Sequence, residues 1–170
     1  MAPLAISERQ MRSLEELIFL MQSRERVSSE EIELMRKNRR PDFLRDTKEQ
    51  IEQKLSNIRG EANSMEFLTG PFDEVRNFIS SQNNNIDFQI ETTKNCFLEY
   101  FRIGLTPPPY YPFRIAVILR KANLVAVEQR FLEAWVSHFP DDIGGSFTSL
   151  LERLEKITKK KAELIGLKRK

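Results

Sequence analysis

The chain contains one cysteine, Cys96, and one histidine, His138, among its 170 residues. A single cysteine cannot form a disulfide within the chain, and one cysteine with one histidine is too few for a zinc site made of those ligands. A catalytic histidine needs a nucleophile and an orienting acid, and the sequence places neither beside His138. These two residues therefore give no indication of an enzyme or of a metal site.

Glycine is also scarce, with six residues, and three of the eight prolines are consecutive, at Pro107 to Pro109. The glycines form no phosphate-binding pattern of the Walker or dinucleotide type, so no cofactor is expected. Adjacent acids at Asp141 and Asp142 precede Gly144, a pattern typical of a loop or a helix start. So few turn residues favour long helices over many short strands.

Long apolar runs are absent, and none approaches the roughly 18 residues that a membrane span requires. The first residues show no basic region followed by an apolar stretch, as a secretory signal would. We therefore expect a soluble intracellular protein, cytoplasmic or nuclear, that does not associate with a membrane.

Helix starts are marked by three capping boxes, Ser7-x-x-Gln10, Ser28-x-x-Glu31 and Thr47-x-x-Gln50. Pro71 is expected as the first residue of a fourth helix that ends before Asn83. Apolar residues at helical spacing predict the remaining helices, over residues 86–104, 112–121, 124–139 and from 146 into the C-terminal tail. Ile86, Phe88 and Ile90 also alternate, which leaves a short strand as an alternative there.

The predicted fold class is all-α, with seven or eight helices. The helices are expected to form antiparallel hairpins, packed as a small bundle or as a short helical-repeat-like array. No low-complexity linker divides the chain, so residues 1–170 are interpreted as a single domain. If the chain has a seam, it lies near residues 83–85, between the N-terminal helices (1–82) and a helical-hairpin half with the basic tail (86–170).

One segment, at about residues 86–154, resembles a divergent tetratricopeptide-type helical hairpin. The residues that carry the resemblance are a small and apolar set: Ile115, Ala116, Val127, Phe131, Ala134 and Pro140. The sequence departs from the family at Val127, where alanine is usual, at the missing Trp and Gly of the first helix, and at Pro140, one position late. The resemblance implies a scaffold that binds other proteins or peptides.

The second predicted helix of this hairpin carries its large apolar side chains on one stripe. Phe131, Ala134 and Trp135 are interpreted as core residues, with Ala134 allowing a close helix crossing. His138 lies near the end of the same helix, where a positive charge would complement the helix dipole.

A first candidate binding site surrounds the proline-rich loop and the helix that follows it. Two tyrosines beside basic side chains could hold a carboxylate or stack on a base. The alternative is that the tyrosines fill the hairpin and the basic residues are a solvated face. The site residues are Tyr110, Tyr111, Arg114, Arg120 and Lys121.

Two basic stretches, residues 36–40 and 156–170, form an alternative, nucleic-acid-binding site. The second stretch has seven Lys and Arg against one acid, whereas the rest of the chain has 20 basic and 24 acidic residues. Basic residues at a helix end equally complement the dipole. The residues of this alternative site are Arg36, Lys37, Arg39, Arg40, Lys159, Lys160 and Lys161.

The function expected from these patterns is a non-enzymatic protein–protein interaction module, as an adaptor or as a subunit of a larger assembly. The alternative is a nucleic-acid-associated accessory protein that uses residues 36–40 and 156–170, and an enzyme of unrecognised class comes third. A protein partner is expected, and homo-oligomerisation is left open.

Overall fold

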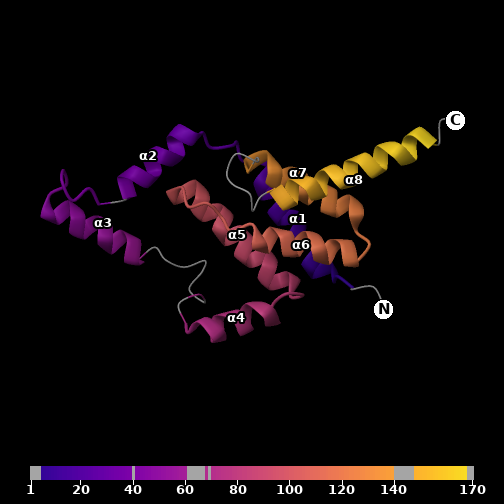
Figure 1. Ribbon diagram of the computed structural model, residues 1–170, viewed down its shortest axis with the longest axis horizontal. Helices are drawn as coiled ribbons and strands as arrows, with labels where there is room; N and C mark the ends of the chain where they lie inside the picture. Colours follow the sequence, from indigo (N-terminus) through magenta and orange to yellow (C-terminus); the bar gives the residue numbers. More distant parts are fainter. Residues whose placement is uncertain (1–4, 40, 61–67, 69, 140–147, 168–170) are drawn as a thin grey trace. The chain divides into compact units, whose positions relative to one another are not determined.

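A computed structural model describes residues 5–39, 41–60, 68, 70–139 and 148–167. These residues form eight helices and no strand, which confirms the all-α prediction (Figure 1). The helices are α1 (Glu8–Gln22), α2 (Ser29–Arg39), α3 (Lys48–Gly60), α4 (Phe72–Ser81), α5 (Ile86–Ile103), α6 (Tyr110–Lys121), α7 (Val125–His138) and α8 (Thr148–Leu167).

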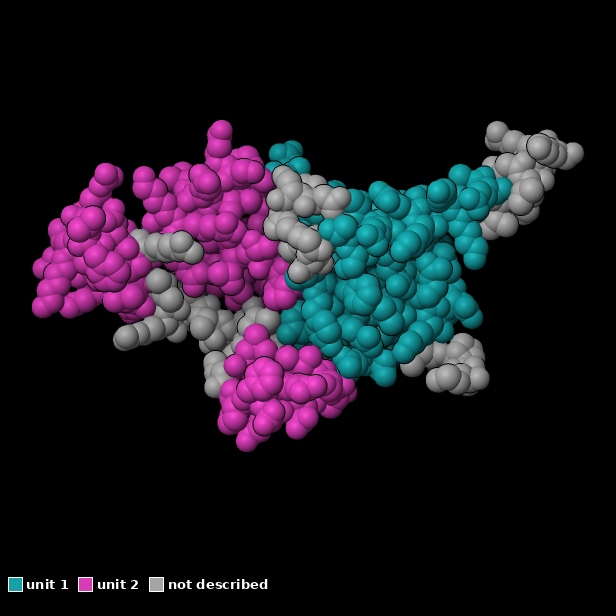
Figure 2. All heavy atoms as spheres, in the orientation of Figure 1, with its two compact units in different colours: residues 1–26, 83–90, 109–170 teal, residues 27–82, 91–108 magenta. Residues whose placement is uncertain are grey.

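The chain divides into two compact units, coloured separately in Figure 2. Unit 1 comprises residues 1–26, 83–90 and 109–170, and therefore α1, the start of α5, and α6 to α8. Unit 2 comprises residues 27–82 and 91–108, with α2 to α4 and the rest of α5.

The first three helix starts have the caps that their sequences predict. Ser7 and Gln10 exchange both bonds of a capping box at the start of α1. Ser28 pairs with Glu31 before α2, and Thr47 pairs with Gln50 before α3, in the same reciprocal way. Each box satisfies two of the backbone N–H groups that a helix start leaves unpaired.

Helices α6 and α7 of unit 1 form a tight hairpin because α6 ends in a specific turn. Asn123 takes a left-handed backbone conformation with φ of 61°, which asparagine tolerates better than most residues. Its N–H bonds the carbonyl of Arg120, and the N–H of Leu124 bonds that of Leu119, as in a Schellman cap. The chain therefore reverses over residues 122–124, and α7 packs back on α6.

The core of unit 1 is centred on α7, which packs against α1, α6 and α8. Phe131 and Trp135 are fully buried, and Ala134 is 4% exposed, so the prediction that all three are core residues is confirmed. The rings of Trp135 and Phe139 lie 4.5 Å apart between centroids. The facing residues of the other helices include Leu14, Leu17, Ile115, Leu119 and Leu150.

Unit 2 differs from unit 1 in that two of its helices, α2 and α4, contribute no buried residue to a core. The end of α5 fixes α2: Gly104 has φ of 69°, and a Cβ added to it would lie 3.1 Å from the carbonyl oxygen of Ile32. Arg36 then donates from Nε to the carbonyl of Gly104 and from Nη2 to the hydroxyl of Thr106. Glycine is required here by its backbone conformation and by the close approach of α2.

Several boundaries differ from the sequence-based predictions. The strand alternative at residues 86–90 is wrong, since these residues begin α5. Pro71 is the N-cap residue of α4 and not its first helical residue. Helix α6 begins two residues before Pro112, because Pro109 serves as its N-cap. Pro140, Asp141, Asp142 and Gly144 lie outside the described residues.

Phe131 offers a direct test of the core. Phe131→Ala should lower the free energy of unfolding by about 3–5 kcal/mol, since it leaves a cavity beside Trp135. Urea unfolding followed by fluorescence measures this in unit 1, because Trp135 is the chain's one tryptophan. Phe19→Ala is the control: Phe19 is 72% exposed, and its loss should change stability by at most about 0.5 kcal/mol. Equal effects of the two substitutions would contradict this core.

Candidate functional site

The tyrosine and arginine cluster expected around α6 is divided between the two ends of that helix. At its first turn, the Tyr110 hydroxyl bonds the side chain of Asn83, and Arg114 donates from Nε and Nη2 to the Asn83 carbonyl at 3.0 and 2.7 Å. Tyr111 is 3% exposed, with its ring in edge contact with Tyr110. Tyr110 and Arg114 thus hold the loop before α5 within unit 1, while Tyr111 packs against Tyr110 and against Phe88 of α5.

Arg120 and Lys121 lie at the opposite end of α6, which is about 16 Å away at 1.5 Å per residue. Arg120 donates from Nε to a carboxylate oxygen of Glu128 at 2.7 Å. Lys121 is exposed. The five residues therefore do not form one site, and Arg120 belongs to a different group of side chains.

Glu128, on the first turns of α7, is the centre of that group. Its side chain is fully buried, and it accepts bonds from Arg120 of α6 and from Nε of Arg153 of α8. Arg153 also donates to the Ala116 carbonyl at 3.2 Å, and its guanidinium lies 5.9 Å from the centre of the Phe113 ring. One carboxylate thus joins three helices, and a charge buried in this way requires such partners.

Sequence reasoning did not identify Glu128 or Arg153, although a signal was present. Glu128 occupies the apolar stripe of α7, three residues before Phe131 and seven before Trp135. An acid at a core position is rare unless it is paired. The stripe therefore predicts a basic partner from another helix, but only the folded chain identifies it as Arg153.

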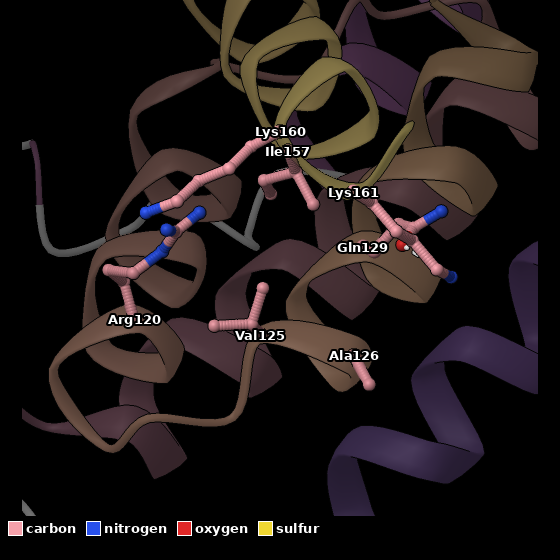
Figure 3. A pocket seen from close by; sticks show the side chains of 7 residues that line it. All are labelled: Arg120, Val125, Ala126, Gln129, Ile157, Lys160 and Lys161. Carbon is pink, nitrogen blue, oxygen red and sulfur yellow. Dashed lines mark hydrogen bonds between the residues drawn. The ribbon is translucent and has the colours of Figure 1, made fainter. Parts of the chain in front are cut away.

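Next to this network lies a groove of about 370 Å³ on α6, α7 and α8 (Figure 3). Its volume is at the low end of the roughly 300–1,000 Å³ typical of ligand sites. The lining has three apolar residues, one amide and three basic residues, whose side chains are called the rim: Arg120, Val125, Ala126, Gln129, Ile157, Lys160 and Lys161. All seven belong to unit 1.

The groove exists because α8 continues beyond the helices on which it packs. Ile157, which is 5% exposed, is the last residue of α8 described as buried, and residues 158–163 are all exposed. The first turn of α7 borders the groove on one side, and the projecting part of α8, from Ile157 to Lys161, borders it on the other. Val125 in that turn of α7 is 39% exposed, and Ala126 is exposed as well.

The electrostatic character of the groove is positive. Arg120, Lys160 and Lys161 line it, and no acid is among its described lining residues. In Figure 3 the ends of Lys160 and Arg120 point to the same side, while Lys161 bonds the Gln129 amide oxygen at 3.4 Å. The uncapped start of α7 adds the positive end of a helix dipole.

The other predicted basic residues lie in unit 2 or outside the groove. Arg36 is bonded to Gly104 and Thr106, and together with Lys37 it lines a shallow hollow on α2 that also contains Glu30 and Glu33. Two acids there offset two bases. Arg39 is partly buried in α2, Lys159 is exposed on α8 outside the groove lining, and Arg40 lies outside the described residues.

The described residues offer no group of three or more His, Cys, Asp and Glu that could hold a metal ion. Cys96 is 3% exposed within α5. Among the helices that the structure describes, none is both long and apolar enough to cross a membrane.

Comparison of the chain with protein-family models, with curated proteins and with solved structures finds no significant match. The tetratricopeptide resemblance of the α6–α7 hairpin therefore stays a prediction.

His138 is not placed to carry the positive charge that its position near the end of α7 suggested. It is 1% exposed, and its Nε2 lies 2.7 Å from the carbonyl oxygen of Met21. Burial lowers the pKa of the imidazole below its usual 6.5, and the charge of Arg26 lowers it further, while the bond to Met21 acts in the opposite direction. The neutral ring with its proton on Nε2 fits this site.

This pKa shift predicts a pH-dependent stability. When the folded pKa is below the unfolded one, the unfolded chain binds more protons between the two values. The free energy of unfolding should therefore decrease as the pH falls through 6.5. The slope should not exceed about 1.4 kcal/mol per pH unit, the value for one proton.

Urea unfolding between about pH 7.5 and pH 5.5 tests this, because His138 is the chain's one histidine and ordinary histidines titrate in this range. His138→Gln keeps a side-chain donor for Met21 and removes the titration, so its stability should stay nearly constant over the range. The same slope in both proteins would show that His138 is not a buried neutral ring.

Proposed function

We propose that this protein is a non-enzymatic protein-interaction module that binds a segment of a partner protein in the groove on α6, α7 and α8. The observation that carries the proposal is the composition of that groove. Val125 and Ala126 leave apolar surface open to solvent near the buried Ile157, and three basic side chains line the groove with them. An apolar centre with a polar rim is the usual organisation of a protein–protein contact.

Two further features support this proposal over an enzyme. The walls of the groove are helices fixed by the Glu128 network, so a partner meets a preformed surface. The groove lining contains no carboxylate, histidine, serine or cysteine in its described part, and these are the side chains that most often carry acid–base or nucleophilic chemistry. The role as adaptor or as assembly subunit follows from this proposal.

The nucleic-acid alternative rests on the exposed lysines of α8. Lys156, Lys159, Lys160 and Lys161 are all exposed on one projecting segment. Proteins that bind single-stranded nucleic acid commonly add aromatic side chains on which bases stack, and the described lining of the groove has none. The apolar lining residues therefore favour a protein partner.

A peptide selection tests the proposed function. Random peptides of about 16 residues, roughly four helical turns, are displayed on phage and selected against the full chain. We expect enriched peptides, and Ala126→Trp should weaken their binding at least about tenfold, because the indole adds a large side chain to the lining that the peptide contacts. Fluorescence anisotropy with the synthesised peptides measures the change in Kd.

Ala162→Trp is the matched control. Ala162 is exposed on α8, outside the groove lining, and lies about 140° around the helix from Ile157. This variant should bind the selected peptides as the unmodified chain does. The proposal is wrong if no peptide is enriched over the bare support, or if the two tryptophan variants bind equally well.

A further inference from the structure

We infer that the segment bound in this groove is an acidic amphipathic α-helix, an inference that rests on the function proposed above. Three properties of the groove lead to it: the excess of positive charge at its rim, the helical character of its walls, and the arrangement of apolar and basic side chains along α8. Each constrains the occupant separately.

The first constraint is charge. Two acids are bonded to groove residues: Glu128, fully buried and shared between Arg120 and Arg153, and the exposed Glu133, which accepts a bond from Gln129. Four cations, Arg120, Arg153, Lys160 and Lys161, thus stand against two carboxylates, which leaves a local charge of +2. A partner with Asp or Glu beside its apolar residues would neutralise this excess and associate faster.

The second constraint is the backbone. An extended peptide gains affinity by adding to the open edge of a sheet. The described residues contain no strand, and the walls of the groove are helices whose backbone groups are largely bonded internally. A helical occupant satisfies its own N–H and C=O groups except those at its two ends, so few of them lose a hydrogen bond when the helix is desolvated.

The third constraint is the pattern on α8. At 100° per residue, Lys160 and Lys161 lie on either side of Ile157, by about 60° and 40°. The face towards the groove thus has one apolar side chain, Ile157, with a lysine on either side of it. A helix with apolar residues at i, i+4 and i+7 can cover Ile157 and Val125, and carboxylates on both sides of its apolar face would meet the lysines, as in helix-in-groove recognition.

The test uses a fluorescein-labelled peptide of about 16 residues, with Leu on one helical face and Glu at the flanking positions. A second peptide has Gln in place of every Glu, and a single-stranded DNA of about 20 nucleotides is the third probe. The Glu peptide should bind at least about tenfold tighter than the Gln peptide. Its binding should weaken strongly between about 0.05 M and 0.5 M NaCl, where exposed charges are increasingly screened.

Variants of α8 locate the interaction. The double substitution Lys160→Glu and Lys161→Glu should weaken binding of the Glu peptide at least about tenfold, because it reverses the charge on both sides of Ile157. The matched control, Lys156→Glu with Lys159→Glu, makes the same charge change on the same helix outside the groove lining, and should change Kd less than about threefold. Circular dichroism should show the peptide gaining helix when bound.

The possible failures are distinguishable. If the peptides selected from the library bind in an Ala126→Trp-sensitive way but the Glu peptide binds no better than the Gln peptide, the interaction function stands and the acidic helix is wrong. If the DNA binds more tightly than the Glu peptide and is released by Lys160→Glu with Lys161→Glu, the groove belongs to a nucleic acid. Self-association of the chain that Ala126→Trp abolishes would assign the groove to a second copy.

Discussion

The arrangement of unit 1 depends on one buried carboxylate. Glu128 has no exposed surface, and its two oxygens are bonded by Arg120 from α6 and Arg153 from α8. Removing a carboxylate from water costs several kcal/mol, and close cationic partners offset that cost. Apolar burial around Trp135 supplies the stability of the unit, whereas this network determines where α8 crosses the hairpin. The Glu128 network therefore affects the position of α8 more than it affects the total free energy of unfolding.

The groove follows from that geometry. Because Arg153 fixes α8 against α6 and α7, Ile157 reaches the first turn of α7 and Lys160 and Lys161 come to its two sides. Arg120 takes part in both arrangements, since its Nε bonds Glu128 while the residue lines the groove. The structural network and the proposed recognition surface thus share one side chain. This coupling explains why an arginine from the tyrosine cluster and two lysines from the C-terminal stretch meet in one place.

Local signals in the sequence were sufficient for the helices. Capping boxes at Ser7, Ser28 and Thr47 mark three starts, and the stripe through Phe131 and Trp135 predicts the core, because a cap and an apolar helical stripe each consist of residues a few positions apart along the chain. The site depends on contacts between residues that are far apart in the sequence. Glu128 and Arg153, for example, are 25 positions apart. Sequence alone cannot choose which of the chain's 27 basic residues bonds a given acid. The residues of each site that the sequence suggested therefore lie in different places in the folded chain.

A double-mutant cycle between Glu128 and Arg153 tests this account most directly. Glu128→Gln, Arg153→Met and the double variant are compared by urea unfolding, with the exposed pair Glu152 and Lys156 of α8 as the control cycle. The account predicts a coupling free energy of at least about 1.5 kcal/mol for the buried pair and of at most about 0.5 kcal/mol for the exposed pair. A coupling for Glu128 and Arg153 as small as that of the control would contradict the claim that this ion pair holds α8 in place.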